Sequence, residues 1–244
     1  MTMDLKEKYI SLATTLFYNK HFYKLILEKK YIEHFGDIEL IKMKNIYDSM
    51  IINKKLEENF SMANDNSVQY NILVEYRAKK EFFDLKRQIK ELENNIMENS
   101  KILKELELFL AKDMENAIRT LVSKTSPFVT KNKKALALFT QFNKDLTKGN
   151  WKQVLNAAKE AKNFRVLKTD LSEEEISEEI KNLESQIVSL KNRFPFTKLE
   201  ILKDEKSIEN VKSQESKDVK NMIESYQRMT DIYLSTSTTP EWFS

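Results

Sequence analysis

Hydrophobic residues recur along this chain at alternating spacings of three and four, the period that places side chains on one face of an α-helix. The most regular row lies within residues 82–112, where Asn99 is the one polar member. About four heptads of this kind are typical of a coiled coil, in which a single polar seam residue lowers stability but fixes the register. The apolar members are Phe82, Leu85, Ile89, Leu92, Ile96, Leu103, Leu106 and Leu110.

A second row with the same period lies within residues 171–194. Ser172 predicts the N-cap of its helix, and Glu175, three positions later, completes a capping box. The acidic residues around this helix start suit the positive end of the helix dipole, which explains them without paired catalytic carboxylates. The two rows extend about 43 Å and about 34 Å at the helical rise per residue. We therefore predict an antiparallel coiled-coil hairpin with residues 113–163 inserted at its tip.

The N-terminal region predicts a helical hairpin over residues 1–60. Gly36 stands where a helix C-cap is expected, and Asp37 follows as the N-cap of the next helix. Residues 61–81 then hold a linker of small polar residues and the start of the long helix, because such residues compete with helical hydrogen bonds.

The insert at residues 113–163 predicts three short helices, with a break at residues 125–128 and a cap at Gly149. Beyond the second row, the pattern predicts a C-terminal helix over residues 204–234. The Ser- and Thr-rich residues 235–244 predict a flexible tail.

The composition favours the same all-α fold class. Two glycines and three prolines in 244 residues are too few for the turns of a β-rich chain. The net charge is +3 with both signs interspersed, so no nucleic-acid partner is expected. The sequence has no cysteine and no apolar run of about 20 residues, so we expect no disulfide, no membrane span and a cytoplasmic location.

No pattern of side chains points to catalysis. His21 and His34 belong to no metal-binding motif, and the chain has neither a glycine-rich phosphate loop nor a nucleophile elbow. We therefore expect a non-enzymatic protein without catalytic residues, metal or cofactor. The N-terminal aromatics exceed what one helix stripe buries, so they form a partner or self-association surface or pack against residues 37–60. These aromatics are Tyr9, Phe17, Tyr18, Phe22, Tyr23, Tyr31 and Phe35.

The insert and its flanks resemble bacterial J-domain proteins in which the J domain is held within long coiled-coil helices. AIRTLVSKTSPFV (117–129) is similar to the end of the second J-domain helix and the following loop. KALALFTQFNKDLTKGNW (134–151) is similar to the third helix and its turn, and LSEEEISEEIKNLESQIVSLKNRFPF (171–196) to the coiled coil that follows. The resemblance implies a helical J-like module within residues 80–200.

The family's His-Pro-Asp loop, which stimulates the ATPase of DnaK-class chaperones, falls here on Ser126-Pro127-Phe128, and only the proline agrees. The resemblance therefore implies a degenerate J-like module that does not stimulate this ATPase. Ser126→His with Phe128→Asp is the shortest route to J-like activity. Basic residues at the predicted tip contact an acidic protein surface or phosphates, or they form a solvated face. The predicted partner-binding residues are Ser126, Pro127, Phe128, Lys131, Lys133, Lys134, Lys148 and Lys152.

Together these patterns predict a protein-interaction module that acts as an adaptor, scaffold or regulator. Its partner is another protein, either a DnaK-class chaperone or an unrelated client, and the apolar rows also permit a homodimer through the coiled coil. The alternative function is a secreted effector or a structural coiled-coil component of a larger assembly, suggested by the tail STSTTPEWFS (235–244).

Overall fold

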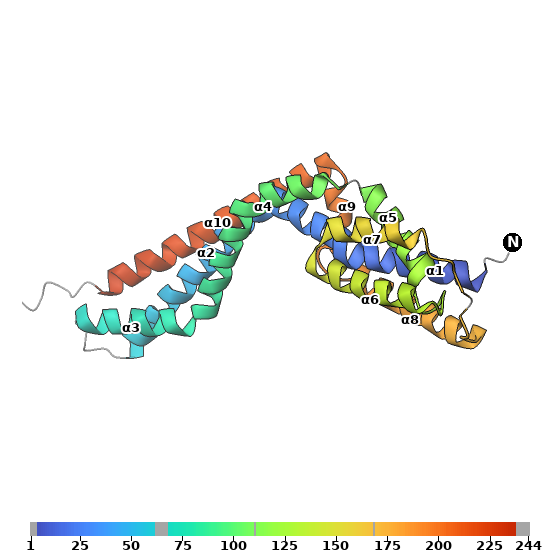
Figure 1. The fold of residues 1–244 in the computed structure, drawn as a ribbon. Coiled ribbons are helices and arrows are strands. Elements are labelled where there is room, and N and C mark those ends of the chain that lie inside the picture. The colour runs from blue at the N-terminus through green and yellow to red at the C-terminus, as the bar shows by residue number, and fades with distance from the viewer. Residues whose placement is uncertain (1–3, 62–67, 110, 168, 238–244) are drawn as a thin grey trace, which may run out of the picture. The chain divides into compact units, whose positions relative to one another are not determined.

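The computed structural model describes residues 4–61, 68–109, 111–167 and 169–237, and these contain helices but no strand (Figure 1). The predicted all-α class is confirmed. The chain divides into two compact units, Met1–Lys30 with Lys101–Leu202 (unit 1) and Tyr31–Ser100 with Lys203–Ser244 (unit 2). None of the described helices is both long enough and apolar enough to cross a membrane.

Unit 1 is a bundle in which α7 packs against α5 and α6, while α1 packs against α5 and α8. The chain runs from α1 through a π-helical stretch, η1, into the start of α2, and it returns to this unit at the end of α4. In chain order the elements are α1 (Leu5–Phe17), η1 (Tyr18–Tyr23), α2 (Lys24–Ser61), α4 (Phe83–Glu107), α5 (Ala111–Thr125), α6 (Lys133–Lys148), α7 (Trp151–Ala161), α8 (Glu173–Lys191), η2 (Phe196–Lys198) and α9 (Leu199–Leu202).

The core of unit 1 forms where the apolar stripes of these helices meet. Phe142 of α6 and Ile118 of α5 are fully buried, and each such side chain contributes about 1.5–3 kcal/mol when it leaves water. On α7 the buried face is built from small residues, Ala157, Ala158 and Ala161. Because these side chains are short, α7 can lie close to α5.

Local signals set the start of α8 and the end of α6 as predicted. The Ser172 hydroxyl accepts the Glu175 backbone N–H at 3.2 Å, and the Glu175 carboxylate accepts the Ser172 N–H at 2.7 Å. This capping box accounts for the acidic helix start. Gly149 follows α6 in the left-handed conformation, with φ 72°, so the predicted cap is confirmed as well.

The apolar row of α8 packs against α1. Ile180, Leu183 and Ile187 are buried in the same cluster as Tyr9 and Ile10. The hairpin predicted between residues 82–112 and 171–194 is therefore not confirmed, because α8 finds its apolar partner in the N-terminal helix. A heptad row specifies which face is buried but not which helix covers it.

Unit 2 contains the remainder of α2, α3 (Val68–Glu81), α4 up to Ser100, and α10 (Glu205–Ser237). Ion pairs connect α2 to each of the other three helices. The pairs are Lys55–Glu75 to α3 at 2.5 Å, Lys44–Glu93 to α4 at 2.6 Å and Lys42–Glu215 to α10 at 3.2 Å.

The row predicted on residues 82–112 does face inward, since Ile89 and Asn99 are both less than 10% exposed. The turn predicted at Gly36 is wrong, and with it the N-terminal hairpin over residues 1–60. Helix α2 runs without a break through Gly36 and Asp37. A Cβ atom on Gly36 would lie 3.0 Å from the Ile96 Cγ1 atom. The glycine therefore allows α4 to approach α2 closely instead of ending a helix.

Two predicted irregular segments lie largely outside the described residues. These are the polar linker, of which residues 62–67 are not described, and the tail, of which residues 238–244 are not described. The tail was predicted to begin at residue 235, but residues 235–237 belong to α10.

Candidate interaction surfaces

The loop between α5 and α6 is folded into unit 1 rather than presented to solvent. Ser126 is 0% exposed, and its hydroxyl lies 2.6 Å from the Tyr9 hydroxyl. Phe128 donates its backbone N–H to the Ser126 hydroxyl at 3.3 Å, and its ring centroid lies 4.9 Å from that of Tyr9. Burial raises the pKa of Tyr9 to about 12, so the phenol keeps its proton at neutral pH. We call this arrangement the Tyr9–Ser126 lock.

The segment between α7 and α8 holds the same loop from outside. The Thr169 hydroxyl donates to the Pro127 carbonyl at 3.1 Å, and the Lys131 backbone N–H donates to the Leu167 carbonyl at 3.2 Å. The Lys131 ammonium also pairs with Asp170 at 2.7 Å. These contacts restrain the loop in addition to its contacts with Tyr9.

The structure separates the predicted partner-binding residues into two groups. One group precedes α6 or lies in its first turn, and the other lies at its end, about 22 Å away along the helix. Ser126 is buried, Phe128 is half-buried, and the other six residues are exposed. The first group comprises Ser126, Pro127, Phe128, Lys131, Lys133 and Lys134, and the second comprises Lys148 and Lys152.

Lys148 shares a hollow with residues from the N-terminal part of the chain. This hollow, of about 330 Å³, is lined by Lys20 and Lys24 from η1 and α2 and by Lys148 and Trp151 from α6 and α7. Its one carboxylate, Glu28, lies 3.4 Å from the Lys24 ammonium.

A second hollow, of about 430 Å³, shares Lys148 with the first, adds Lys144 and is lined by no carboxylate. Four lysines therefore border two adjoining hollows that hold a single glutamate. We call Lys20, Lys24, Lys144 and Lys148 the basic surface.

Core packing brings the two halves of the basic surface together. The Trp151 ring meets the Phe22 ring edge-on, with 5.1 Å between centroids, and Phe22 lies in η1 between Lys20 and Lys24. The turn before Trp151 is fixed by Asp145, whose carboxylate accepts the side-chain amide of Asn150 at 3.0 Å. The basic surface is therefore held by a rigid turn and an aromatic contact. No local sequence pattern indicates that η1 and the end of α6 lie together.

His21 lines the same hollow as Lys20, Lys24 and Lys148. Burial lowers the pKa of His21, and the charges of Lys20 and Lys24 lower it further. The imidazole is therefore predominantly neutral at pH 7, which leaves the positive charge of the hollow to its lysines.

An apolar hollow adjoins the basic surface. It measures about 580 Å³, and four of its eight lining residues are Leu108, Phe109, Gly149 and Trp151, while the other four are the polar residues Glu105, Asn150, Lys152 and Gln153. We call it the apolar hollow after Leu108 and the two aromatic rings. Leu108 is 80% exposed, and Gly149 and Trp151 line both this hollow and the basic one. Apolar and cationic groups thus stand on either side of the same turn.

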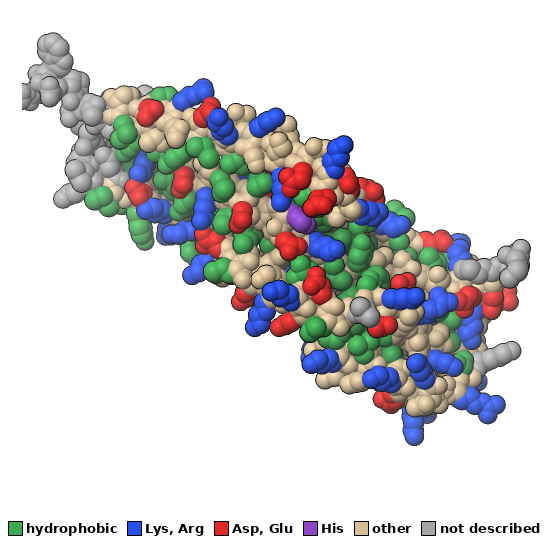
Figure 2. Space-filling view, turned by 90° about the horizontal axis from the view of Figure 1, so that it is seen from above, with side chains coloured by type: hydrophobic (Ala, Val, Ile, Leu, Met, Phe, Trp, Pro, Cys, Tyr) green, Lys and Arg blue, Asp and Glu red, His purple; other side chains and the backbone are tan. Residues whose placement is uncertain are grey.

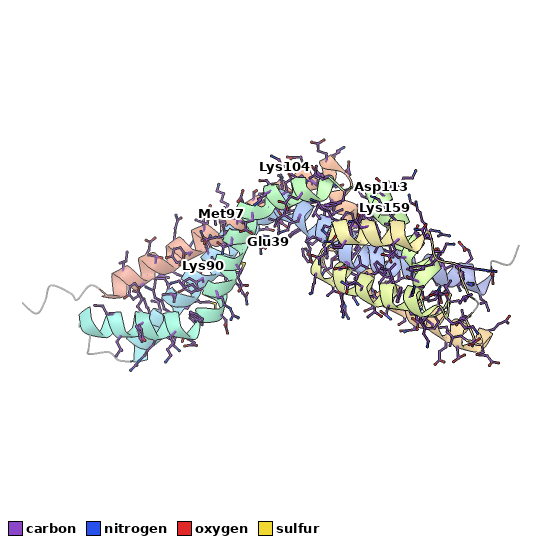
Figure 3. All side chains as sticks on the ribbon, in the orientation of Figure 1. Glu39, Lys90, Met97, Lys104, Asp113 and Lys159 are labelled. Atoms are coloured by element: carbon purple, nitrogen blue, oxygen red, sulfur yellow. The ribbon has the colours of Figure 1, made fainter. Side chains whose placement is uncertain are left out.

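A further hollow, between α5 and α7, is lined by charges of both signs, two lysines and one aspartate. It measures about 420 Å³, with Ala117 and Ala158 among its lining residues and both Asp113 and Lys159 at its border (Figure 3). Figure 2 likewise shows cationic and anionic side chains interspersed over the face seen there. In the hollows of the basic surface, by contrast, four lysines face the single carboxylate of Glu28.

Three of the seven N-terminal aromatics, Tyr9, Phe22 and Phe35, are buried, and the other four are partly buried. Tyr9 and Phe22 are buried in unit 1, where Phe17 meets Phe142 of α6 with 5.8 Å between ring centroids. They pack on helices α5 to α8 rather than on residues 37–60. Phe35 is buried in unit 2.

The chain matches no protein-family model, no curated protein and no solved structure. Among the residues that the structure describes, no group of three or more histidine, cysteine, aspartate and glutamate side chains is arranged to hold a metal ion.

Proposed function

We propose that this protein is a non-enzymatic interaction module, an adaptor or regulator, with a degenerate J-like segment that does not stimulate the ATPase of DnaK-class chaperones. The observation that carries this proposal is the Tyr9–Ser126 lock. A chaperone that reads the side chains of the tripeptide would meet Pro127 and only part of Phe128, because Ser126 is buried and Phe128 is half-buried against Tyr9.

The charge of α5 supports the same proposal. The resemblance to the J-domain family implies a basic helix before the loop. Here Arg119 of α5 is engaged by the Glu7 carboxylate of α1, and Asp113 and Glu115 offset Lys112 and Lys124. The exposed face of α5 therefore offers little net positive charge to such a partner.

The direct test is a single-turnover ATPase measurement with a DnaK-class chaperone. An active J-domain protein serves as the positive control, and the full chain is added over a range of concentrations. We expect no acceleration at any concentration. A dose-dependent acceleration of ATP hydrolysis would contradict the proposal that the J-like segment is degenerate.

The interaction part of the proposal needs a separate measurement. Mild crosslinking in native lysate, followed by quantitative identification, should return a partner that is captured by the folded chain and not by a heat-denatured sample. If the chaperone dominates the capture while its ATPase stays unstimulated, the protein binds it as a non-stimulating ligand. If no protein is enriched over the denatured control, the proposed interaction function is wrong.

A further inference from the structure

We propose that the basic surface and the apolar hollow beside it form one docking site for an acidic amphipathic segment of a partner protein. This inference rests on the proposed function as an interaction module, and it names the chemistry of the partner.

The first support is charge. Lys20, Lys144 and Lys148 form no ion pair with any carboxylate in the described part of the chain, whereas Lys24 pairs with Glu28. Lysines gathered around adjoining hollows repel one another, and anionic side chains from a partner would relieve that repulsion. Because the four lysines come from two segments that core packing brings together, the positive field is concentrated at one place on unit 1.

The second support is the apolar hollow. Leu108 is a large side chain left 80% exposed, and it stands beside Phe109 and Trp151 around a hollow of about 580 Å³. A hollow of this size admits an aliphatic or aromatic anchor, the kind of side chain that dominates binding energy in protein interfaces. Gly149 and Trp151 line both hollows, so one bound segment can reach both.

The geometry favours a carboxylate-bearing segment over a single phosphate group. The cations are lysines, which act as point charges, and no arginine fork lines either hollow. At the start of α7 the backbone N–H groups of Trp151, Gln153 and Val154 already donate to the carbonyls of Gly149 and Asn150, which leaves few backbone donors for a phosphate group. A helical segment with apolar side chains at spacings of three and four, and glutamates between them, matches cations beside an apolar hollow.

The test uses the full chain and the fluorescence of Trp151. The protein has two tryptophans, so Trp242→Phe leaves Trp151 as the single reporter. The probe is a synthetic helical peptide of glutamate and leucine, with the leucines at alternating spacings of three and four. Matched peptides replace every glutamate by lysine or every leucine by serine, and inorganic phosphate serves as competitor.

Charge reversal and loss of the apolar anchor are tested separately. Lys20→Glu with Lys148→Glu reverses two exposed lysines of the basic surface, and Leu108→Asp changes the exposed apolar side chain. Matched controls lie on exposed positions of α8 that line neither hollow. They are Lys181→Glu with Lys191→Glu, and Val188→Asp, whose side chain is 59% exposed.

We expect the glutamate–leucine peptide to shift the Trp151 emission with a Kd in the micromolar range. The double lysine reversal should weaken binding by about tenfold or more, and Leu108→Asp by about fivefold, while the α8 controls change it less than twofold. Equal binding of the lysine peptide, equal weakening by the controls, no binding at all or displacement by millimolar phosphate would each overturn the inference. None of these results alters the ATPase and capture measurements, so a failure of the docking site is distinguishable from a failure of the proposed function.

Discussion

The Tyr9–Ser126 lock yields a quantitative prediction for stability. Both hydroxyls are buried, at 3% and 0% exposure, and lie 2.6 Å apart. In Tyr9→Phe the Ser126 hydroxyl still accepts the Phe128 N–H, so the free energy of unfolding should fall by only about 1 kcal/mol. In Ser126→Ala the Tyr9 hydroxyl stays buried without its partner and the Phe128 N–H loses its acceptor, so the expected loss is about 2 kcal/mol.

The double variant, Tyr9→Phe with Ser126→Ala, removes both hydroxyls, so no buried phenol is left without a hydrogen-bond partner. Its loss should be about 2 kcal/mol rather than the sum of about 3, which corresponds to a coupling energy of about 1 kcal/mol. The measurement is urea unfolding followed by Trp151 fluorescence in the Trp242→Phe background, because Trp151 packs in unit 1. Additive single losses within about 0.3 kcal/mol, or a Tyr9→Phe loss larger than that of Ser126→Ala, would refute the lock as described.

Three further predictions concern stability. Gly36→Ala should destabilise the protein by about 1 kcal/mol, because overpacking against Ile96 outweighs the gain in helix propensity. In an Ile96→Ala background the same substitution should be stabilising. Thermal unfolding of the wild type, the two single variants and the double variant tests both expectations. Gly149→Ala should lower the free energy of unfolding by about 1 kcal/mol, because an alanine is strained in the left-handed conformation of this residue. The added Cβ itself would lie at an ordinary 3.5 Å from the Trp151 ring, so the cost comes from the backbone alone. An unchanged urea midpoint would contradict this prediction. Burial lowers the folded-state pKa of His21, so the unfolded chain binds more protons and stability falls as pH drops below about 6.5. His21→Gln should lose less stability than the wild type between pH 7 and pH 5 in parallel urea titrations.

The structure also changes the route to restoring J-like activity. Ser126→His would place an imidazole at a fully buried position against Tyr9, and Phe128→Asp would remove the ring contact and bring a carboxylate beside the phenol. The double substitution is therefore expected to unfold the loop before it displays the motif, because overpacking and a buried charge both cost stability. Circular dichroism and urea unfolding of this variant must precede any ATPase measurement on it.

Local sequence signals determine the fold class, two of the helix ends and the inward face of one helix in this protein. The scarcity of glycine and proline indicates the all-α class, and Ser172 with Glu175 marks the start of α8 through hydrogen bonds within one turn. Gly149 marks the end of α6 for the same reason, since a left-handed cap is a property of a single residue. The apolar row on residues 82–112 identifies the inward face of its helix, with Asn99 on that face.

Tertiary structure decided which faces meet, because the hydrophobic effect has no direction and any apolar stripe satisfies another. Gly36 shows this most directly, since the same residue that ends many helices here lies inside one and makes room for Ile96. The pairing of α8 with α1, the burial of Ser126 under Tyr9 and the approach of Lys20 to Lys148 all join residues more than a hundred positions apart. The hydrophobic period indicates only which side chains leave water and not which helix covers them, so the tertiary structure was needed to identify these contacts.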